Sequence, residues 1–242
     1  MAKPSKRYAR LREQIDGNRK YSTAEAFDML INLGAKDGAK FDESVDVAVR
    51  LGVNPKYADQ MVRGACSLPH GTGKGVRVLV FAEGEAARSA TEAGADFVGG
   101  QDLIDKIKGG WLEFDKAVAT RAMMPKVARF LGRILGPRGL MPNPKIGTVV
   151  DDGKVGETVA SLMKGKIDFR VDKNGIIHSS VGKASMPSEK LQENFMALLS
   201  TLIRLKPSTA KGAYVRSISV STTMGPGIKV DTNDAQRSAE RY

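Results

Sequence analysis

The feature that most constrains the fold of this chain is a nearly continuous apolar run at residues 76–82, followed by alternating helical and strand patterns. A strand that is apolar on both faces has to be covered on both faces, as in parallel sheets flanked by helices. The expected elements are a strand at 76–82, a helix at 85–93, a strand at 95–98, a helix at 101–108, a strand at 117–120 and a helix at 125–135. This order predicts a small α/β unit with a parallel sheet.

The two flanks of this segment follow a different pattern. Residues 41–51 and 166–172 alternate between apolar and polar side chains, as half-buried strands do. The second stretch runs into Asn174-Gly175, a strong hairpin signal. The remaining expected elements are a helix opened by the capping box Ser22–Glu25, a strand at 176–178, a helix from Ser188 to about Leu205 and a strand at 214–220. These elements predict an α+β domain.

Neither flank has enough strands to form an independent sheet, because isolated hairpins are marginal in water. We therefore expect one discontinuous α+β domain from residues 1–67 plus 158–242, with residues 68–157 as an inserted α/β domain. Pro69 and Gly71 lie in the first crossing, whose composition suits a hinge. The polar tail at 231–242 is expected to be frayed.

Charge is strongly positive and unevenly distributed. The chain has 38 Lys and Arg against 27 Asp and Glu, a net charge of +11. Residues 68–157 hold 13 basic and 11 acidic residues, so the flanks hold 25 and 16. Excess cations favour a polyanionic partner, nucleic acid first and an anionic membrane surface second.

Several other classes of function are disfavoured. The single Cys66 cannot form an intramolecular disulfide, which fits a reducing cytosol. The basic N-terminus is not followed by an apolar segment, so no secretory signal is expected, and no apolar run is long enough to span a bilayer. His70 and His178 fall in different expected domains, so they predict no metal cluster, and no cofactor is expected.

A nucleotide-dependent enzyme built on the central α/β unit is the rival hypothesis. The segment Gly71-Thr72-Gly73-Lys74-Gly75 lacks the hydroxyl residue and the spacing of a phosphate-binding loop, and it precedes a strand instead of following one. The turn after the first strand holds one glycine and two acids, which would repel a pyrophosphate. Asp151-Asp152 has no third ligand nearby and is interpreted as a solvated turn.

The most unusual segment is the turn at residues 221–227. The strand before it places Tyr214, Ile218 and Val220 on one face, whereas the other face carries Val215 and the serines at 217, 219 and 221. Gly225 and Pro226 make the turn rigid, and Met224 within it is hard to explain as a core residue. In a basic chain this turn suggests a nucleic-acid contact.

Two further candidates are open from the residues alone. Phe41 shares the apolar parity of its strand, which favours the core, but it begins that strand beside Lys40, where an aromatic can stack on RNA. The rigid loop at 136–145 is flanked by Arg133, Arg138 and Lys145, and it fits an ordinary loop about as well as a phosphate contact.

Four blocks of this sequence resemble the L-one family of bacterial ribosomal proteins, which belong to the lateral stalk of the large subunit. The blocks are Lys40-Phe41-Asp42-Glu43-Ser44-Val45, Ser67-Leu68-Pro69-His70-Gly71, residues 132–145 and Thr222-Thr223-Met224-Gly225-Pro226. The resemblance covers nearly the whole chain up to about Val230.

This resemblance implies a discontinuous RNA-binding domain with an inserted Rossmann-like, three-layer domain, in a protein that is not an enzyme. It also implies large-subunit rRNA, exit-site tRNA, the mRNA of the protein's own operon and other ribosomal components as partners. The implied roles are release of deacylated tRNA and repression of translation, on ribosomes in the cytoplasm.

The resemblance also implies which residues contact RNA. They are Lys40, Phe41, Ser44, Arg170, Asp172, Lys173, His178, Ser217, Thr223, Met224 and Gly225. Arg133, Arg138 and Lys145 are implied as a second-domain contact with RNA or tRNA.

Overall fold

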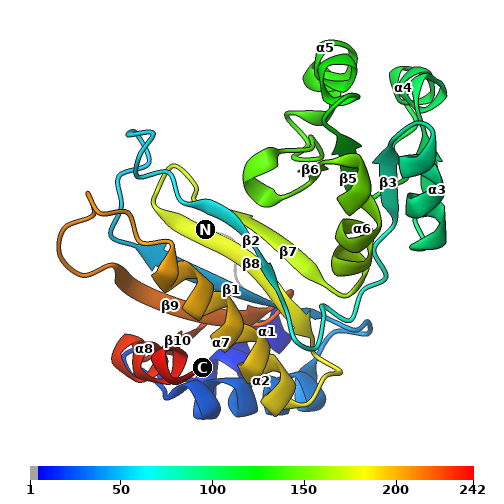
Figure 1. Ribbon diagram of the computed structural model, residues 1–242. Coiled ribbons are helices and arrows are strands. Elements are labelled where there is room, and N and C mark those ends of the chain that lie inside the picture. Colours follow the sequence, from blue (N-terminus) through cyan, green and yellow to red (C-terminus); the bar gives the residue numbers. More distant parts are fainter. Residues whose placement is uncertain (1–4) are drawn as a thin grey trace. The chain divides into compact units, whose positions relative to one another are not determined.

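A computed structural model describes residues 5–242, without the side chains of residues 35–37. The described chain is a mixed α/β protein that divides into two compact units (Figure 1). Unit 1 runs up to Lys74 and resumes at Ile167–Tyr242, and unit 2 spans Gly75–Lys166. Residues 1–4 of the expected first domain lie outside the described residues.

Unit 1 is built on an antiparallel sheet with strand order β10-β9-β1-β8, beside a two-stranded sheet of β2 and β7. Its strands are β1 (Ser44–Leu51), β2 (Arg63–Ser67), β7 (Lys166–Arg170), β8 (Ile176–Lys183), β9 (Val215–Thr222) and β10 (Ile228–Val230). Its helices are α1 (Lys6–Glu13), α2 (Thr23–Asp37), α7 (Ser188–Arg204) and α8 (Thr232–Arg241). The central strand β1 therefore pairs with strands from the far end of the sequence.

The core of unit 1 follows the predicted alternation. Val45, Val47 and Val49 of β1 are buried, and they belong to the same apolar cluster as residues of α2 and α7. The rings of Phe27 and Phe195 join the two helices, with centroids 5.6 Å apart. The predicted capping box opens α2, so the first turn of this helix is stabilised by its own residues.

The hairpin predicted at Asn174-Gly175 is only partly formed. The turn is present, since Asp172 N–H donates to Ile176 O at 2.8 Å, but a single bridge between Val171 and Ile177 joins the two segments. Strand β7 pairs with β2, whereas β8 pairs with β1. The turn therefore moves the chain from one sheet to the other instead of joining two strands of one sheet.

Unit 2 has a parallel sheet with strand order β4-β3-β5-β6. Its elements are β3 (Val78–Phe81), α3 (Glu85–Glu92), β4 (Phe97–Gly99), α4 (Gln101–Lys108), β5 (Lys116–Thr120), α5 (Met124–Leu135), η1 (Pro144–Ile146), β6 (Val149–Val150), η2 (Asp152–Lys154) and α6 (Val155–Met163). Leu79 and Phe81 pack with α4 and α5, whereas Val78 and Val80 pack with α3 and α6. The apolar run is thus covered on both faces, as its composition predicts.

The observed boundaries of unit 2, Gly75 and Lys166, differ from the predicted boundaries of 68 and 157. Leu68 is buried in the core of unit 1, so the chain leaves that unit only after Lys74. At the other end, α6 packs against α3 and β5, which keeps residues up to Lys166 in unit 2.

The prediction of a frayed tail is wrong. Residues 232–241 form α8, in which Ala235 and Ala239 are buried, and the helix lies against α7. Asp231 caps the helix by accepting a hydrogen bond from Asn233 N–H at 2.9 Å. Two small residues four positions apart are enough to bury one stripe of an otherwise polar helix.

The predicted face of Val215 is also wrong. Val215 is buried although Ser217 is exposed, because the pairing of β1 with β9 shifts by one residue between Arg50 and Leu51. The shift brings Val215 opposite the buried Leu51. Within the described part of the chain, no helix is long and apolar enough to cross a membrane.

Candidate nucleic-acid interface

The candidate interface starts where β1 begins and β9 ends. Thr223 N–H donates to Ser44 O at 3.0 Å, and Ser44 N–H donates to the Thr223 hydroxyl at 3.0 Å. The two residues are 179 positions apart in the sequence. These two hydrogen bonds join main-chain groups and one short side chain, which have little freedom to move. They therefore fix the turn after β9 to the start of β1.

Glu43 is the buried centre of this junction. Its side chain is 4% exposed, and its carboxylate accepts hydrogen bonds from Met224 N–H at 2.7 Å and Ala39 N–H at 2.8 Å. The Arg7 guanidinium lies 3.9 Å from the same carboxylate and donates to Met224 O at 3.0 Å. One carboxylate therefore joins the loop before β1 to the turn after β9.

The environment of Glu43 favours its ionised form. Burial by itself raises the pKa of this carboxyl, but the N–H groups of Ala39 and Met224 lower it. The Thr222 hydroxyl and the Arg7 guanidinium lower the pKa further, and the net shift is downward. The junction is thus built around a carboxylate, not a carboxylic acid.

We expect the protein to lose stability as the pH falls through this lowered pKa. The unfolded chain takes up the proton near the ordinary glutamate pKa of about 4.3, and the folded chain only at lower pH. The contribution of Glu43 is therefore complete above that pH and shrinks below it. Urea unfolding of wild type and Glu43→Gln between pH 7 and pH 3 should show the wild-type advantage narrowing; a constant difference contradicts the assignment.

Phe41 and Lys40 lie at the tip of the loop before β1. Phe41 is 56% exposed, so its interpretation as a core residue is wrong. The chain is held on both sides of this tip, by Ala39 as described and by Asp42, whose carboxylate accepts from Ser185 N–H at 3.1 Å and from the Ser185 hydroxyl at 2.9 Å. The aromatic ring is therefore presented to solvent from an anchored loop.

Met224 and Gly225 occupy the turn after β9. Met224 is 52% exposed, although its N–H is bound to Glu43. A Cβ on Gly225 would collide with the Thr222 hydroxyl oxygen, so an added side chain would displace that hydroxyl. Gly225 therefore has a structural reason to be glycine, and the exposed thioether is the group that this turn offers to a partner.

A polar face of the main sheet extends from this junction. Cross-strand rows place Asp46 between Ser180 and Ser221, and Ala48 between His178 and Ser219. Burial raises the pKa of Asp46, and the Ser180 hydroxyl opposes the shift.

Farther along, Ser217 pairs with Arg50, and both are exposed. Ser217 lies six residues from Thr223, about 20 Å along the strand. The predicted serine and histidine therefore belong to a long sheet face and not to the turn itself.

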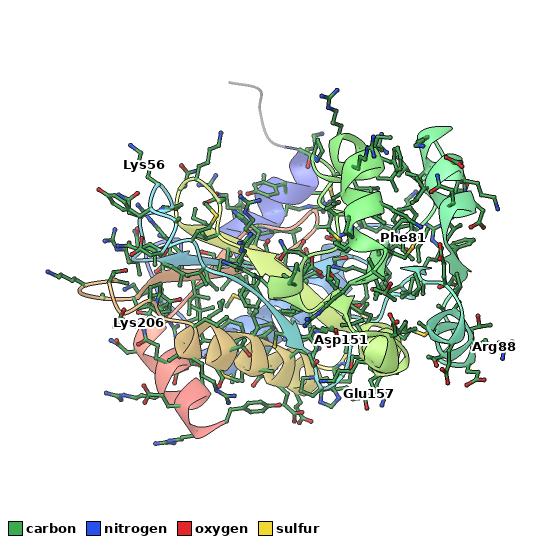
Figure 2. The ribbon with its side chains drawn as sticks, turned by 45° about the horizontal axis from the view of Figure 1, so that its top comes forward. Lys56, Phe81, Arg88, Asp151, Glu157 and Lys206 are labelled. Carbon is green, nitrogen blue, oxygen red and sulfur yellow. The ribbon has the colours of Figure 1, made fainter. Side chains whose placement is uncertain are left out.

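The turn between β7 and β8 borders a separate groove of about 710 Å³. It is lined by Pro55, Lys56, Met61, Arg170, Val171, Asp172 and Lys173. Figure 2 shows Lys56 at the outer end of its loop. The Asp172 carboxylate accepts from Asn174 N–H and Ile176 N–H, both at 2.8 Å, so it shapes the turn. The cations Arg170 and Lys173 are exposed there.

The remaining predicted residues belong to unit 2 or to the first crossing segment. Arg133, Arg138 and Lys145 are exposed in unit 2, on α5, in the loop that follows it and in η1, respectively. Pro69 is exposed in unit 1, and Gly71 has a φ of 64°, which favours glycine.

Sequence reasoning missed Glu43, Lys183 and Arg7. In the alternating pattern Glu43 falls on the same side as the buried valines of β1. A carboxylate at a position expected to be buried was the feature that could have marked it. The Lys183 ammonium donates to Asp42 O at 3.2 Å and to the Ser44 hydroxyl at 3.1 Å. No local pattern marks Lys183 or Arg7, because both act on segments distant in sequence.

Comparison with known proteins gives one consistent result. The family described as "Ribosomal protein L1p/L10e family" matches residues 33–226. Large ribosomal subunit protein uL1 of Bdellovibrio bacteriovorus is 54% identical over 230 residues, covering 95% of this chain and 96% of that protein. The proteins of the same name from Solidesulfovibrio magneticus and Corynebacterium glutamicum are 54% and 52% identical over 240 residues, covering 99% of this chain and at least 99% of each of those proteins.

Proposed function

The chain belongs to the ribosomal protein L1p/L10e family, and from this premise we propose that unit 1 binds large-subunit ribosomal RNA. As a family member it is a structural protein of the large ribosomal subunit and not an enzyme. The proposed surface consists of the loop 38–44 and the turn 222–227, and the polar sheet face continues it.

The observation that carries this proposal is the anchored junction of two exposed apolar side chains. Phe41 and Met224 both project from segments whose main chains are bound to the Glu43 carboxylate. Large apolar groups held in solvent on a rigid frame suit contact with ribose or a base, and nearby hydroxyls can reach 2′-hydroxyl groups. Lys40 adds attraction to phosphates.

The distribution of charge supports the same assignment. Unit 1 has 24 basic and 16 acidic residues, whereas unit 2 has 14 and 11. We therefore propose that unit 1 is the discontinuous RNA-binding domain and that unit 2 is the domain inserted into it. On this view the insertion separates the two halves of the RNA surface in sequence without separating them in space.

Three finer proposals follow, of which the first two rest on the family resemblance and the third on the Pro/Gly composition of the first crossing. The protein assists release of deacylated tRNA from the exit site, with Arg133, Arg138 and Lys145 near RNA or tRNA. It represses translation of its own operon by binding mRNA at the same surface that binds rRNA. Pro69 and Gly71 belong to a hinge between the units.

Competition between a stalk RNA fragment and the mRNA leader tests whether one surface serves both RNAs.

Replacing Phe41 by alanine should weaken binding to a stalk RNA fragment by about 2 kcal/mol, as measured for bases stacked on aromatic side chains. Because the ring is half exposed, the free energy of unfolding should change by less than about 0.5 kcal/mol. Filter binding at a stated salt concentration measures the first quantity, and urea unfolding the second.

Tyr242→Ala is the matched control, since Tyr242 is 55% exposed at the end of α8. Equal affinities of wild type and Phe41→Ala would remove the loop from the proposed surface. Titration with labelled nucleotides in parallel tests the rival hypothesis, which the non-enzymatic family already disfavours.

A further inference from the structure

Helix α5 of unit 2 has an outer face of which the proposed function uses only Arg133. Its inner residues Val127, Leu131 and Leu135 are fully buried against the sheet. The helix contains no acidic residue among its 12 positions. Its orientation is therefore fixed by the core, and its solvent side is free of negative charge from the helix itself.

Four exposed residues share the outer face of α5. They are Lys126, Arg129, Phe130 and Arg133. Spacings of three and four residues place them on one stripe, and seven residues along a helix span about 10 Å. Among the described residues, neither Arg129 nor Arg133 has a carboxylate within 4 Å. The stripe therefore has positive charge that the protein does not neutralise.

Phe130 organises the cations around it. The ring is 39% exposed, the Lys108 ammonium of α4 lies 4.1 Å from its centroid and the Arg129 guanidinium lies 5.5 Å from it. Such contacts between a cation and a ring face are worth about 0.5–1 kcal/mol at exposed sites. An exposed phenylalanine thus holds cations of two helices in place, which lowers the entropy lost when they bind an anion.

Two carboxylates moderate this charge but do not cancel it. Asp105 lies 3.1 Å from the Lys108 ammonium, and Glu83 lies 3.8 Å from that of Lys126. All four of these side chains are substantially exposed, so water and salt weaken both pairs. Four cations therefore face solvent with two exposed carboxylates beside them.

We propose that the α5 stripe, defined as Lys108, Lys126, Arg129, Phe130 and Arg133, is an accessory binding surface for the phosphate backbone of RNA. A stripe of about 10 Å matches two or three successive phosphates better than one small anion. One aromatic ring among four cations offers little apolar area to a lipid bilayer. The choice of RNA as the partner rests on the proposed function, but every residue of the stripe belongs to unit 2.

The test uses the full chain and an RNA duplex of about 20 base pairs that lacks the stalk sequence. Arg129→Glu combined with Arg133→Glu should weaken binding at least tenfold at 0.1 M salt. It should also lower the slope of log affinity against log salt by about 2, for two lost phosphate contacts. The unfolding midpoint checks that the variant is folded.

Arg88→Glu combined with Lys154→Glu is the matched control. Both residues are exposed in unit 2, on α3 and η2, in the layer on the other face of the sheet. Figure 2 shows Arg88 at the periphery of this unit and Phe81 in its interior. The control carries the same change in net charge, and its affinity for the duplex should stay within twofold of wild type.

Equal losses in both double variants would overturn the proposal, because net charge and not the stripe would then explain binding. Tight binding to phosphatidylserine vesicles that the stripe variant abolishes, with duplex affinity unchanged, would assign the surface to a membrane instead. If the stripe variant binds the duplex as wild type does while Phe41→Ala loses stalk RNA, the inference fails and the proposed function stands. The converse result rejects the unit 1 surface alone.

Discussion

Glu43→Ala is expected to lower the free energy of unfolding by about 3 kcal/mol and to weaken stalk RNA binding at least tenfold. The first effect arises because the N–H groups of Ala39 and Met224 lose a buried acceptor, at about 1–3 kcal/mol for each unsatisfied group. The second arises because the loop and the turn would no longer be fixed to one another. Urea unfolding and filter binding measure the two quantities.

Glu43→Gln and Glu189→Ala test the cause of this effect. The glutamine oxygen can accept from one N–H, but its amide group is a donor facing the other, so we expect an intermediate loss. Glu189 is exposed in the first turn of α7, and its removal should change stability by less than about 0.5 kcal/mol. If Glu43→Ala binds RNA as tightly as wild type, the junction is not needed to shape the surface.

Asn194→Ala is expected to cost about 3 kcal/mol of stability, since it breaks three hydrogen bonds of a buried side chain, one of them fully buried and two partly buried. The side chain of Asn194 is fully buried in α7. Its oxygen accepts from His70 N–H at 3.0 Å, and its amide donates to Gly71 O and to Val181 O, both at 2.8 Å. The substitution would release the first crossing segment from the core of unit 1.

Two variants sharpen this second prediction. Asn194→Asp should destabilise more than alanine does, because a second oxygen would face two carbonyl groups. Asn32→Ala, on the exposed side of α2, should be close to neutral. A small effect of Asn194→Ala on urea unfolding would show that water replaces the lost partners and that the crossing segment is not held by this side chain.

The exposure of Phe41 could not be predicted from the alternation of side chains along its strand. Parity along the strand favours the core, but β1 begins at Ser44, so the alternation does not extend to Phe41. Glu43, in contrast, is buried. The N–H groups of Ala39 and Met224 donate hydrogen bonds to its carboxylate and so offset the cost of burying it. The position of a strand end depends on partners elsewhere in the chain, and a local pattern does not contain them.

The sequence by itself determined the periodic elements and the family. The helices at 101–108 and 188–204 and the doubly covered strand at 78–81 follow from side-chain spacing, which acts between near neighbours. Tertiary structure alone decided the transfer of β7 to β2, the docking of α8 and the Glu43 junction. The β2–β7 pairing and the Glu43 junction depend on contacts between residues more than a hundred positions apart. The docking of α8 depends on the burial of two small alanines. Such contacts form only when the chain is folded.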